Sequence, residues 1–383
     1  MTAKIPKHWK IKKLGEIGVF FKGKGVPKNK ITDTGFKCLT YGDLYTKYDF
    51  VIEGVKSFID KEAALISQEI RYGDICFAGS GETLEDIGKC ATFIDDEIGY
   101  AGGDIIVFRT EQNPIVMSYL LNSDIAKKQK FSMGQGHSVV HIYSSQLEML
   151  KLPLPPLEEQ EKIAEILLSC DKAIRLTTQI ITQLKQRKQG LAQQLLTGEK
   201  RVKGFEKSVW KEVRLGELLD YEQPTNYLVK NTDYSDEYKI PVLTAGKTFI
   251  LGYTNEKEGI CTNIPLILFD DFTTDSRYID FPFKVKSSAV KLLKAKKNVN
   301  LRFIFEAMKL IKYAIGGHER HWISKYAFLT IFVPSFKEQN AIAQILDTAH
   351  QELKLYEQKL QLLQAQKKTL MQKLLTGEVL TIK

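Results

Sequence analysis

The feature that most constrains this chain is an internal repeat that recurs at one fixed offset. Residues 155–167 and 334–346 align without a gap; each copy begins with a proline, contains Glu-Gln and ends in Ile-Leu. The same offset places residues 195–199 on residues 374–378, and both of these segments read Leu-Leu-Thr-Gly-Glu. Apart from a tryptophan and a Leu-Gly-Glu near the start of each half, the intervening residues show no comparable match. The sequence therefore predicts a variable domain followed by a repeated segment, twice.

Each repeated segment predicts one long helix with a single apolar stripe. Apolar residues recur at alternating steps of four and three, which is the 3.5-residue spacing of a coiled-coil seam. The only charged position, a lysine, falls in the same place in both copies. The predicted seam comprises Ile163, Leu167, Cys170, Ile174, Thr177, Ile181, Leu184, Lys188, Leu191 and Leu195 in the first copy, and Ile342, Leu346, Ala349, Leu353, Tyr356, Leu360, Leu363, Lys367, Leu370 and Leu374 in the second.

Matched seams of equal length favour pairing of the two helices with each other; the alternative is that each helix packs on its own domain. Proline precedes each helix, and Gly198 and Gly377 follow the last apolar positions, as expected for helix ends. At 1.5 Å per residue each seam is roughly 50 Å long. Antiparallel pairing would carry the two domains to opposite ends of a rod with pseudo-two-fold symmetry, able to contact B-DNA about one and a half turns apart.

Four parts are expected: a first domain at 1–155, a spacer helix at 156–200, a second domain at 201–335 and a spacer helix at 336–383. Both domains are predicted to be α+β, because strand-like runs at 74–78, 104–108, 266–269 and 329–333 are mixed with helical stretches. Five well-separated cysteines argue against disulfides and a zinc site. With neither a signal peptide nor an apolar run long enough to cross a membrane, a cytoplasmic protein with no membrane partner is expected.

Charge and loop chemistry suggest where the domains would contact a polyanion. The net charge is +9 and the pI about 9.0, and lysines cluster at 22–30 and 284–302, which suits phosphate contact but also suits a solvated face. Polar loops follow two predicted strands, and His-containing glycine loops precede both helices; such loops can present side chains to bases, although ordinary solvated turns look the same. The candidate DNA-binding residues are Lys22, Lys24, Lys28, Lys30, Ser80, Thr83, His137, His141, Thr273, Thr274, Arg277, Lys284, Lys286, His318, Arg320 and His321.

Catalytic patterns are fragmentary. Residues 21–25 resemble the first glycine-rich motif of methyltransferases, and residues 18–24 fall one residue short of a phosphate-binding P-loop. The chain has no Asn-Pro-Pro-aromatic motif, no Pro-Asp nuclease anchor and no Gly-x-Ser-x-Gly elbow. His137 and His141 are four apart, but no carboxylate or cysteine stands at metal-site spacing beside them, so no metal site is predicted. The sequence predicts a chain without an active site.

The combined pattern resembles the specificity subunit of type I restriction-modification systems. The resemblance is carried by residues 152–160 with 163–167, by their second copy at 333–346, by the twin Leu-Leu-Thr-Gly-Glu endings and by residues 73–83 and 210–216. It implies two target-recognition domains that each read half of a bipartite double-stranded DNA target, with paired helices that set the gap between the halves.

The same resemblance implies partner subunits that carry out the methylation and cleavage reactions. Two modification subunits would hold S-adenosylmethionine and methylate adenine, and a restriction subunit would use ATP and Mg²⁺ to translocate and cut DNA; the chain itself would hold no cofactor. Glu158, Glu159, Gln160, Glu338 and Gln339 are expected to contact the modification subunits. The rival interpretations are an orphan specificity protein without a restriction subunit, a fragment of a fused single-chain enzyme, a coiled-coil scaffold for two protein-binding domains, and an enzyme active on its own.

Overall fold

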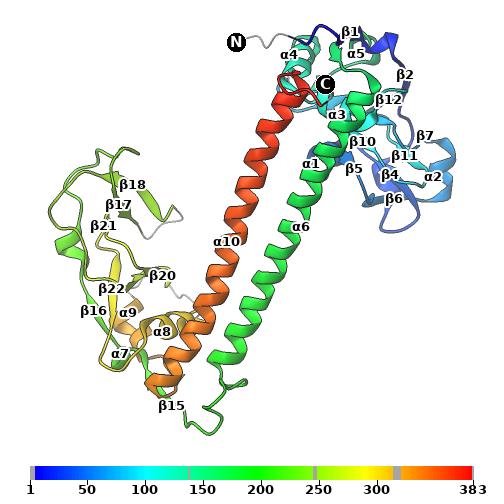
Figure 1. Ribbon diagram of the computed structural model, residues 1–383. Coiled ribbons are helices and arrows are strands. Elements are labelled where there is room, and N and C mark those ends of the chain that lie inside the picture. Colours follow the sequence, from blue (N-terminus) through cyan, green and yellow to red (C-terminus); the bar gives the residue numbers. More distant parts are fainter. Residues whose placement is uncertain (1–4, 137–138, 245–247, 314–320, 382–383) are drawn as a thin grey trace. The chain divides into compact units, whose positions relative to one another are not determined.

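The computed structural model describes residues 5–136, 139–244, 248–313 and 321–381 and divides into two compact units. Unit 1 comprises Met1–Thr177 with Lys359–Lys383, and unit 2 comprises Thr178–Gln358. Each unit contains one α+β domain and the adjoining parts of two long helices (Figure 1). The helices are therefore shared between the units.

The two long helices are α6 (Leu157–Leu196) and α10 (Phe336–Leu375), each of 40 residues. Their starts follow the repeated prolines, and each is followed by a glycine with positive φ: Gly198 at +76° and Gly377 at +71°. A residue with a Cβ is strained in that conformation, which accounts for glycine at both ends of the repeat.

Within each unit α6 and α10 run antiparallel. In unit 2, Lys185 pairs with Glu357 at 3.1 Å and Arg187 pairs with Glu352 at 3.4 Å, so rising numbers on α6 meet falling numbers on α10. In unit 1, Asp171 contacts Lys367, and the start of α6 packs with the end of α10 in one apolar core. All twenty positions of the predicted seam are buried or half-buried. The predicted fold class, two α+β domains with an antiparallel helix pair, is confirmed.

The domain of unit 1 contains two five-stranded sheets and several short helices. The first sheet has the order β2 (Gly18–Lys22), β12 (Ile105–Thr110), β8 (Ile75–Ala78), β10 (Cys90–Phe93), β5 (Val51–Ile52). The second has the order β3 (Ile31–Thr32), β6 (Ser57–Ile59), β4 (Phe36–Leu39), β11 (Gly99–Ala101), β7 (Gln68–Ile70). Two small pairs are β1 (Lys10–Lys13) with β14 (Lys151–Leu154), and β9 (Ser80–Gly81) with β13 (Val140–His141). The helices are α1 (Tyr41–Thr46), α2 (Lys61–Ile66), α3 (Pro114–Leu121), α4 (Asp124–Met133), α5 (Ser144–Leu147), η1 (Leu14–Glu16) and η2 (Lys28–Lys30).

The domain of unit 2 has a four-stranded sheet and a three-stranded sheet. The larger has the order β16 (Leu219–Glu222), β22 (Val290–Ala295), β19 (Leu266–Asp270), β20 (Ser276–Ile279), and the smaller has the order β18 (Ile250–Thr254), β17 (Ile240–Leu243), β21 (Lys284–Val285). β15 (Lys211–Arg214) pairs with β23 (Thr330–Val333). The helices are α7 (Leu215–Leu218), α8 (Leu301–Met308), α9 (His321–Ser324), η3 (Pro224–Tyr227) and η4 (Tyr326–Phe328).

The two domains share an arrangement of strands and helices that is not apparent from their sequences. The strand order β2-β12-β8 in unit 1 matches β16-β22-β19 in unit 2, with antiparallel pairing throughout. In both units a helix with an asparagine N-cap, α3 or α8, follows the central strand, and a two-stranded ladder joins the first strand of the domain to the last. The duplication therefore extends through the domains as well as the helices.

A buried Glu-Gln pair anchors each domain to the helix that follows it. In unit 1, Trp9 Nε1 donates to Glu159 Oε2 at 3.0 Å, and Gln160 Oε1 accepts from the backbone N–H of Asn113 at 2.9 Å. The Gln160 amide also donates to the Pro155 carbonyl at 2.8 Å. We call this arrangement the Glu-Gln clamp. It satisfies donors at the start of α3 and pins the proline that precedes α6.

Unit 2 repeats the Glu-Gln clamp at the equivalent positions of the second long helix. Trp210 Nε1 donates to Glu338 Oε1 at 3.3 Å, and Gln339 accepts from Asn300 N at 2.9 Å while it donates to the Pro334 carbonyl at 3.0 Å. Arg201 adds an ion pair to Glu338 at 2.9 Å.

The expectation that this Glu-Gln segment contacts modification subunits is wrong for four of its five residues. Glu159, Gln160, Glu338 and Gln339 are at most 3% exposed, because their polar atoms hold the helix starts to the domains. Glu158 alone is exposed.

Candidate nucleic-acid interface

Three loops of unit 1 lie around the start of β12, where β2 and β8 leave the sheet. Lys22 at the end of β2 is opposite Ile106, and Ala78 at the end of β8 is opposite Ile105, so both strands end beside the start of β12. Gly23 N then donates to the Ile105 carbonyl at 2.7 Å, on one side of β12, and Gly79 N donates to the Asp104 carbonyl at 2.8 Å on the other. We call residues 23–27, 79–89, 134–136 and 139–141, together with Lys22, loop cluster 1.

The third loop is joined to the second by a short strand pair. In the pairing of β9 with β13, Ser80 is opposite His141 and Val140 is opposite Gly81. The Ser80 hydroxyl lies 3.0 Å from Nδ1 of His141. Four of the predicted residues thus flank the start of β12: the exposed Lys22 and Lys24 on one side, and Ser80 and His141 on the other.

The remaining predicted residues of the first domain differ in their surroundings. Thr83 is exposed in loop cluster 1. Lys30 pairs with Asp60 at 3.2 Å and Glu62 at 3.6 Å, and its hydrogen bond to Asp60 raises the pKa of the ammonium. Lys28 lies in η2. His137 lies outside the described residues. No comparison tests these assignments, and they stay predictions.

Loop cluster 2 is the corresponding region of unit 2. Asp270 at the end of β19 is opposite Val290, and Glu222 at the end of β16 is opposite Leu292, so β22 again lies between two strand ends. The loops there are 223–227, 271–275 and 286–289. They carry the predicted Thr273, Thr274 and Lys286.

Side chains of loop cluster 2 are held in defined conformations. The Thr273 hydroxyl donates to Asp270 Oδ2 at 2.5 Å, and Thr274 has a positive φ of 58°. Arg277, the second residue of β20, pairs with Asp275 at 3.1 Å while its guanidinium lies 5.6 Å from the Phe249 ring. Arg277 and Lys286 are exposed, so a phosphate can reach both side chains.

Two lysines of the cluster at 284–302 are buried and paired with acids from other parts of the domain. Lys284 is 1% exposed, pairs with Glu256 at 2.7 Å and donates to the Glu258 carbonyl at 2.6 Å. Lys291 is fully buried and pairs with Asp271 at 3.3 Å. The assignment of Lys284 to DNA contact is therefore corrected: its charge is compensated by an acid that lies outside the lysine cluster, which a local count of charges does not register.

His321 is also corrected. Its side chain is fully buried, Nδ1 lies 3.3 Å from the Tyr313 hydroxyl, and its backbone N–H donates to the Asp271 carbonyl at 2.9 Å. It joins the start of α9 to loop cluster 2 from inside the domain. His318 and Arg320 lie outside the described residues.

Asp271 is the residue of this region that sequence reasoning missed. Its carboxylate pairs with Lys291 and accepts from the backbone N–H of Trp322 at 2.8 Å, while its backbone carbonyl accepts from the His321 N–H. The signal available in the sequence was the doubled acid Asp270-Asp271 directly after an apolar strand, since a buried acid at a strand end requires donors.

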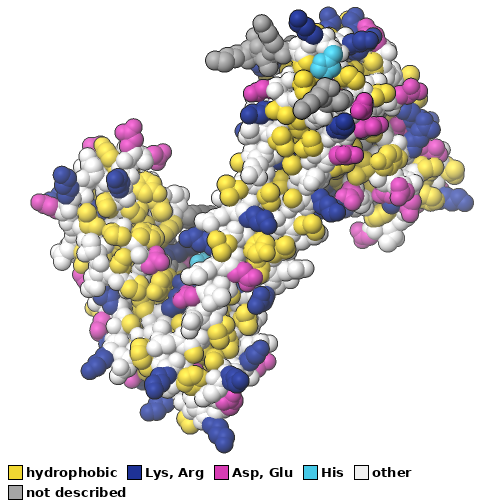
Figure 2. All heavy atoms as spheres, viewed as in Figure 1, with side chains coloured by type: hydrophobic (Ala, Val, Ile, Leu, Met, Phe, Trp, Pro, Cys, Tyr) yellow, Lys and Arg dark blue, Asp and Glu magenta, His cyan; other side chains and the backbone are white. Residues whose placement is uncertain are grey.

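Charge on the surface is mixed. On the face drawn in Figure 2, Lys and Arg side chains alternate with Asp and Glu over both units. The positive net charge of the chain is thus not gathered into one patch there, and the position of Lys22, Lys24, Lys286 and Arg277 beside the strand ends is more informative than total charge.

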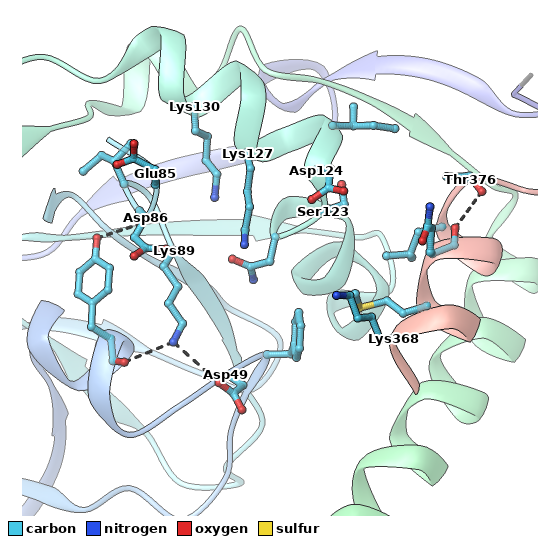
Figure 3. Close-up of a pocket in the computed structure, with 18 residues that line it drawn as sticks. Asp49, Glu85, Asp86, Lys89, Ser123, Asp124, Lys127, Lys130, Lys368 and Thr376 are labelled. Atoms are coloured by element: carbon cyan, nitrogen blue, oxygen red, sulfur yellow. Dashed lines mark hydrogen bonds and ion pairs between the residues drawn. The ribbon is translucent and has the colours of Figure 1, made fainter. Parts of the chain in front are cut away.

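A cavity of about 640 Å³ lies in unit 1 between α4, residues 85–89 and the end of α10. Figure 3 shows Lys127 and Lys130 projecting from α4 toward Lys89 and Asp86. Lys89 lies 3.9 Å from Asp49, and Lys130 donates to the Gly88 carbonyl at 2.6 Å, with burial lowering the pKa of its ammonium. Because acids and lysines alternate around this cavity, it offers no uniform field for a polyanion.

Among the described residues, no cluster of three or more His, Cys, Asp or Glu side chains has the spacing to hold a metal ion. Within those same residues, no helix has the length and apolar character needed to cross a membrane.

Comparison with known proteins identifies the family. The family model described as the type I restriction modification DNA specificity domain matches residues 6–186 and again residues 207–365. The chain is 47% identical to the EcoR124I/EcoR124II specificity subunit of Escherichia coli, over 35% of this chain and 36% of that protein. It is 27% identical to the MjaX specificity subunit of Methanocaldococcus jannaschii over 98% of this chain and 94% of that protein.

Solved structures agree in fold. A type I restriction-modification S subunit from M. genitalium matches 97% of this chain and 96% of its own, with a TM-score of 0.66 and 18% sequence identity. A chain from a type I restriction-modification complex matches 98% of this chain with a TM-score of 0.55. Because the family model occurs twice and covers most of the sequence, the chain belongs to the type I restriction-modification DNA specificity subunits, a non-catalytic class that recognises DNA sequence.

Proposed function

We propose that this chain reads a bipartite double-stranded DNA target and directs adenine methylation and restriction by partner subunits. The observation that carries the proposal is the pair of loop clusters, built at equivalent strand ends but with different side chains. Lys22, Lys24 and His141 characterise loop cluster 1, whereas Thr273 and Arg277 characterise loop cluster 2. Two recognition domains with the same strand arrangement but different side chains in their loops suit a target whose two halves differ in sequence.

The duplicated helices support two modification subunits per chain. Leu176 on α6 and Leu355 on α10 occupy equivalent positions of the repeat, and both are exposed, by 46% and 65%. Apolar side chains exposed at equivalent positions suit two copies of one partner. In this proposal S-adenosylmethionine is held by the modification subunits, ATP and Mg²⁺ by the restriction subunit, and the assembly works in the cytoplasm.

The proposal is tested by mapping methylation. The chain is co-expressed with its modification subunit in a host without adenine methylation, and modified adenines are located by single-molecule sequencing. We expect one motif made of two specified halves with a fixed gap. Methylation without sequence preference would favour a scaffold that joins protein-binding domains. Methylation or cleavage by the purified chain alone would show that the chemistry is not delegated.

A further inference from the structure

The side chains of Ser80 and His141 lie in contact at the surface of loop cluster 1. They are 61 residues apart in sequence, and β9 and β13 place them directly opposite each other, with the Ser80 hydroxyl 3.0 Å from His141 Nδ1. The backbone of His141 also exchanges two hydrogen bonds with Gln135, at 2.9 and 2.7 Å, and Ile142 N donates to the Gly79 carbonyl at 3.0 Å. The imidazole is thus held from its backbone and from one ring nitrogen.

The two side chains differ in access to solvent. Ser80 is 5% exposed, so its hydroxyl serves the imidazole, and the prediction that Ser80 itself contacts DNA is corrected. His141 is half-buried, which leaves part of the ring open. The exposed member of the pair is therefore the imidazole, and the serine acts through it.

The hydrogen bond to Ser80 restricts what the far nitrogen offers. If the hydroxyl donates to Nδ1, the neutral ring carries its proton on Nε2; if the ring is protonated, the hydroxyl accepts from Nδ1 and Nε2 still carries a proton. In both states Nε2 is a donor. Only a neutral ring that donates through Nδ1 to the hydroxyl would make Nε2 an acceptor.

We propose that His141 contacts a base of the target through Nε2–H, pairing with an acceptor such as guanine O6 or a purine N7, and that Ser80 is its positioning residue. This inference rests on the proposed function and names a reader within it. The exposed Lys22 and Lys24 lie across β12 from the pair and would hold the phosphate backbone while the imidazole reads the groove.

The backbone near His141 is constrained. Gly136 has a φ of +121°, and a Cβ there would lie 2.1 Å from the Val139 carbonyl oxygen, so only glycine fits at this position. A contact residue held in one position before binding loses little conformational freedom on binding, which favours selective contacts.

The described residues of unit 2 show no equivalent pair. His321, which lies at the corresponding loop, is buried and directed to Tyr313. Replacing His141 is therefore expected to affect one half of the target and leave the other half unchanged.

The test uses the complete chain in complex with its modification subunit and a plasmid library randomised at the target. For His141→Ala we expect discrimination at one base pair of one half-site to fall by about five- to hundred-fold, the range of a good base contact. The other half-site and the gap should not change. Leu65→Ala, an exposed position on α2 in the same domain but outside loop cluster 1, is the control and should retain the wild-type motif.

Ser80 is tested by non-additivity and rescue. Ser80→Ala should relax the same base pair as His141→Ala, the double variant should be no worse than His141→Ala, and Ser80→Thr, which keeps the hydroxyl, should restore discrimination. Thermal unfolding of each variant separates this effect from loss of fold. Relaxation at a different base pair, or none, would reject the positioning role.

Three results would overturn the His141 assignment while the proposed function stands. One is an unchanged motif; another is a uniform loss of affinity on every sequence, which marks a phosphate contact; the third is a change in both half-sites. If the wild-type complex methylates no bipartite motif at all, the proposed function itself fails, whatever the variants do.

Discussion

The Lys188 ammonium lies 3.3 Å from Nδ1 of His350, across the helix seam of unit 2. At the equivalent level of the other copy, Lys367 contacts Asp171, which also accepts from the Tyr119 hydroxyl. The repeat has kept the lysine and changed its partner from a carboxylate to an imidazole. Polar residues in a seam set the register of paired helices. Because one seam lysine contacts a carboxylate and the other an imidazole, the two halves of the seam are not equivalent.

The contact between Lys188 and His350 predicts that acid lowers the stability of unit 2. Partial burial, then Lys188, Arg302 and Lys309, lower the pKa of His350 below its ordinary value of 6.5, against an opposing effect of Glu306. The unfolded chain therefore binds the proton more readily, and the stabilisation from the neutral ring is complete above pH 6.5 and is lost as pH falls through the folded pKa. Chemical unfolding at about pH 7.5 and about pH 5.5 should show a smaller pH dependence for His350→Asn than for the wild type.

A carboxylate at position 350 should bind Lys188 more strongly than the imidazole does and so stabilise unit 2. His350→Asp recreates the Asp171–Lys367 pair, and we expect the free energy of unfolding near neutral pH to rise by about 0.5–1 kcal/mol. Asp171→His is the reciprocal control and should lower it, because Lys367 and Tyr119 lose their acceptor. A stabilising Asp171→His would contradict the assignment.

The Glu-Gln clamp should matter to folding and not to partner binding. Glu338→Ala removes the carboxylate that Arg201, Ser208 and Trp210 share, and we expect a loss of about 3–5 kcal/mol in the free energy of unfolding, as for other broken buried pairs. Glu158→Ala, an exposed position on α6, is the control and should change it by less than about 0.5 kcal/mol. Denaturant titration measures both, and equal effects would argue against the clamp.

Substitutions of Lys22 and Lys284 should have different effects, the first on DNA binding and the second on stability. Lys22→Ala removes an exposed charge of loop cluster 1, and we expect weaker DNA binding on all sequences, with the slope of log affinity against log salt reduced by about 1. Lys284→Ala removes a buried ammonium that pairs with the half-buried Glu256, and it should lower the unfolding midpoint instead. Affinity measured over a salt series, with thermal unfolding in parallel, distinguishes them; an unchanged salt slope for Lys22→Ala would remove it from the interface.

Leu176 and Leu355 should each serve one modification subunit. We expect Leu176→Glu or Leu355→Glu to reduce the complex from two modification subunits to one, and the double variant to leave none, as measured by native mass spectrometry. Gln179→Glu, another exposed α6 position, controls for added charge. Retention of two subunits by the double variant would place the docking surface elsewhere.

The helices should set the gap in the target. Because residue 171 meets 367 and residue 188 meets 350, deleting 174–180 together with 358–364 removes facing heptads and leaves the remaining register intact. About 10 Å of helix is lost, and we expect the gap between methylated half-sites to shorten by about 3 base pairs. Methylation mapping checks this, and an unaltered gap would show that the helices do not act as a ruler.

The sequence predicted the helices well because their information is local and periodic. Seam spacing, flanking prolines and closing glycines all act within a few residues of the elements they define. The candidate interface was only partly predictable. A count of charges placed Lys22 and Lys284 in the same class, and only the fold shows that Glu256 reaches Lys284 while Lys22 stays exposed. The pairing of Ser80 with His141 depends on a strand contact over 61 residues, which no local pattern contains.

The Glu-Gln clamp has a consequence for how such genes change. Each clamp engages a domain mainly through a tryptophan near its start and the backbone of an asparagine at a helix cap, Trp9 and Asn113 in one copy and Trp210 and Asn300 in the other. His8 adds a contact to the first clamp, and Arg201 and Ser208 add contacts to the second. A foreign domain that brings these few groups would fit the existing helices. Recombination within the duplicated coding segments can therefore replace one reader as a cassette, giving a lineage a new target sequence in a single event while every junction is inherited intact.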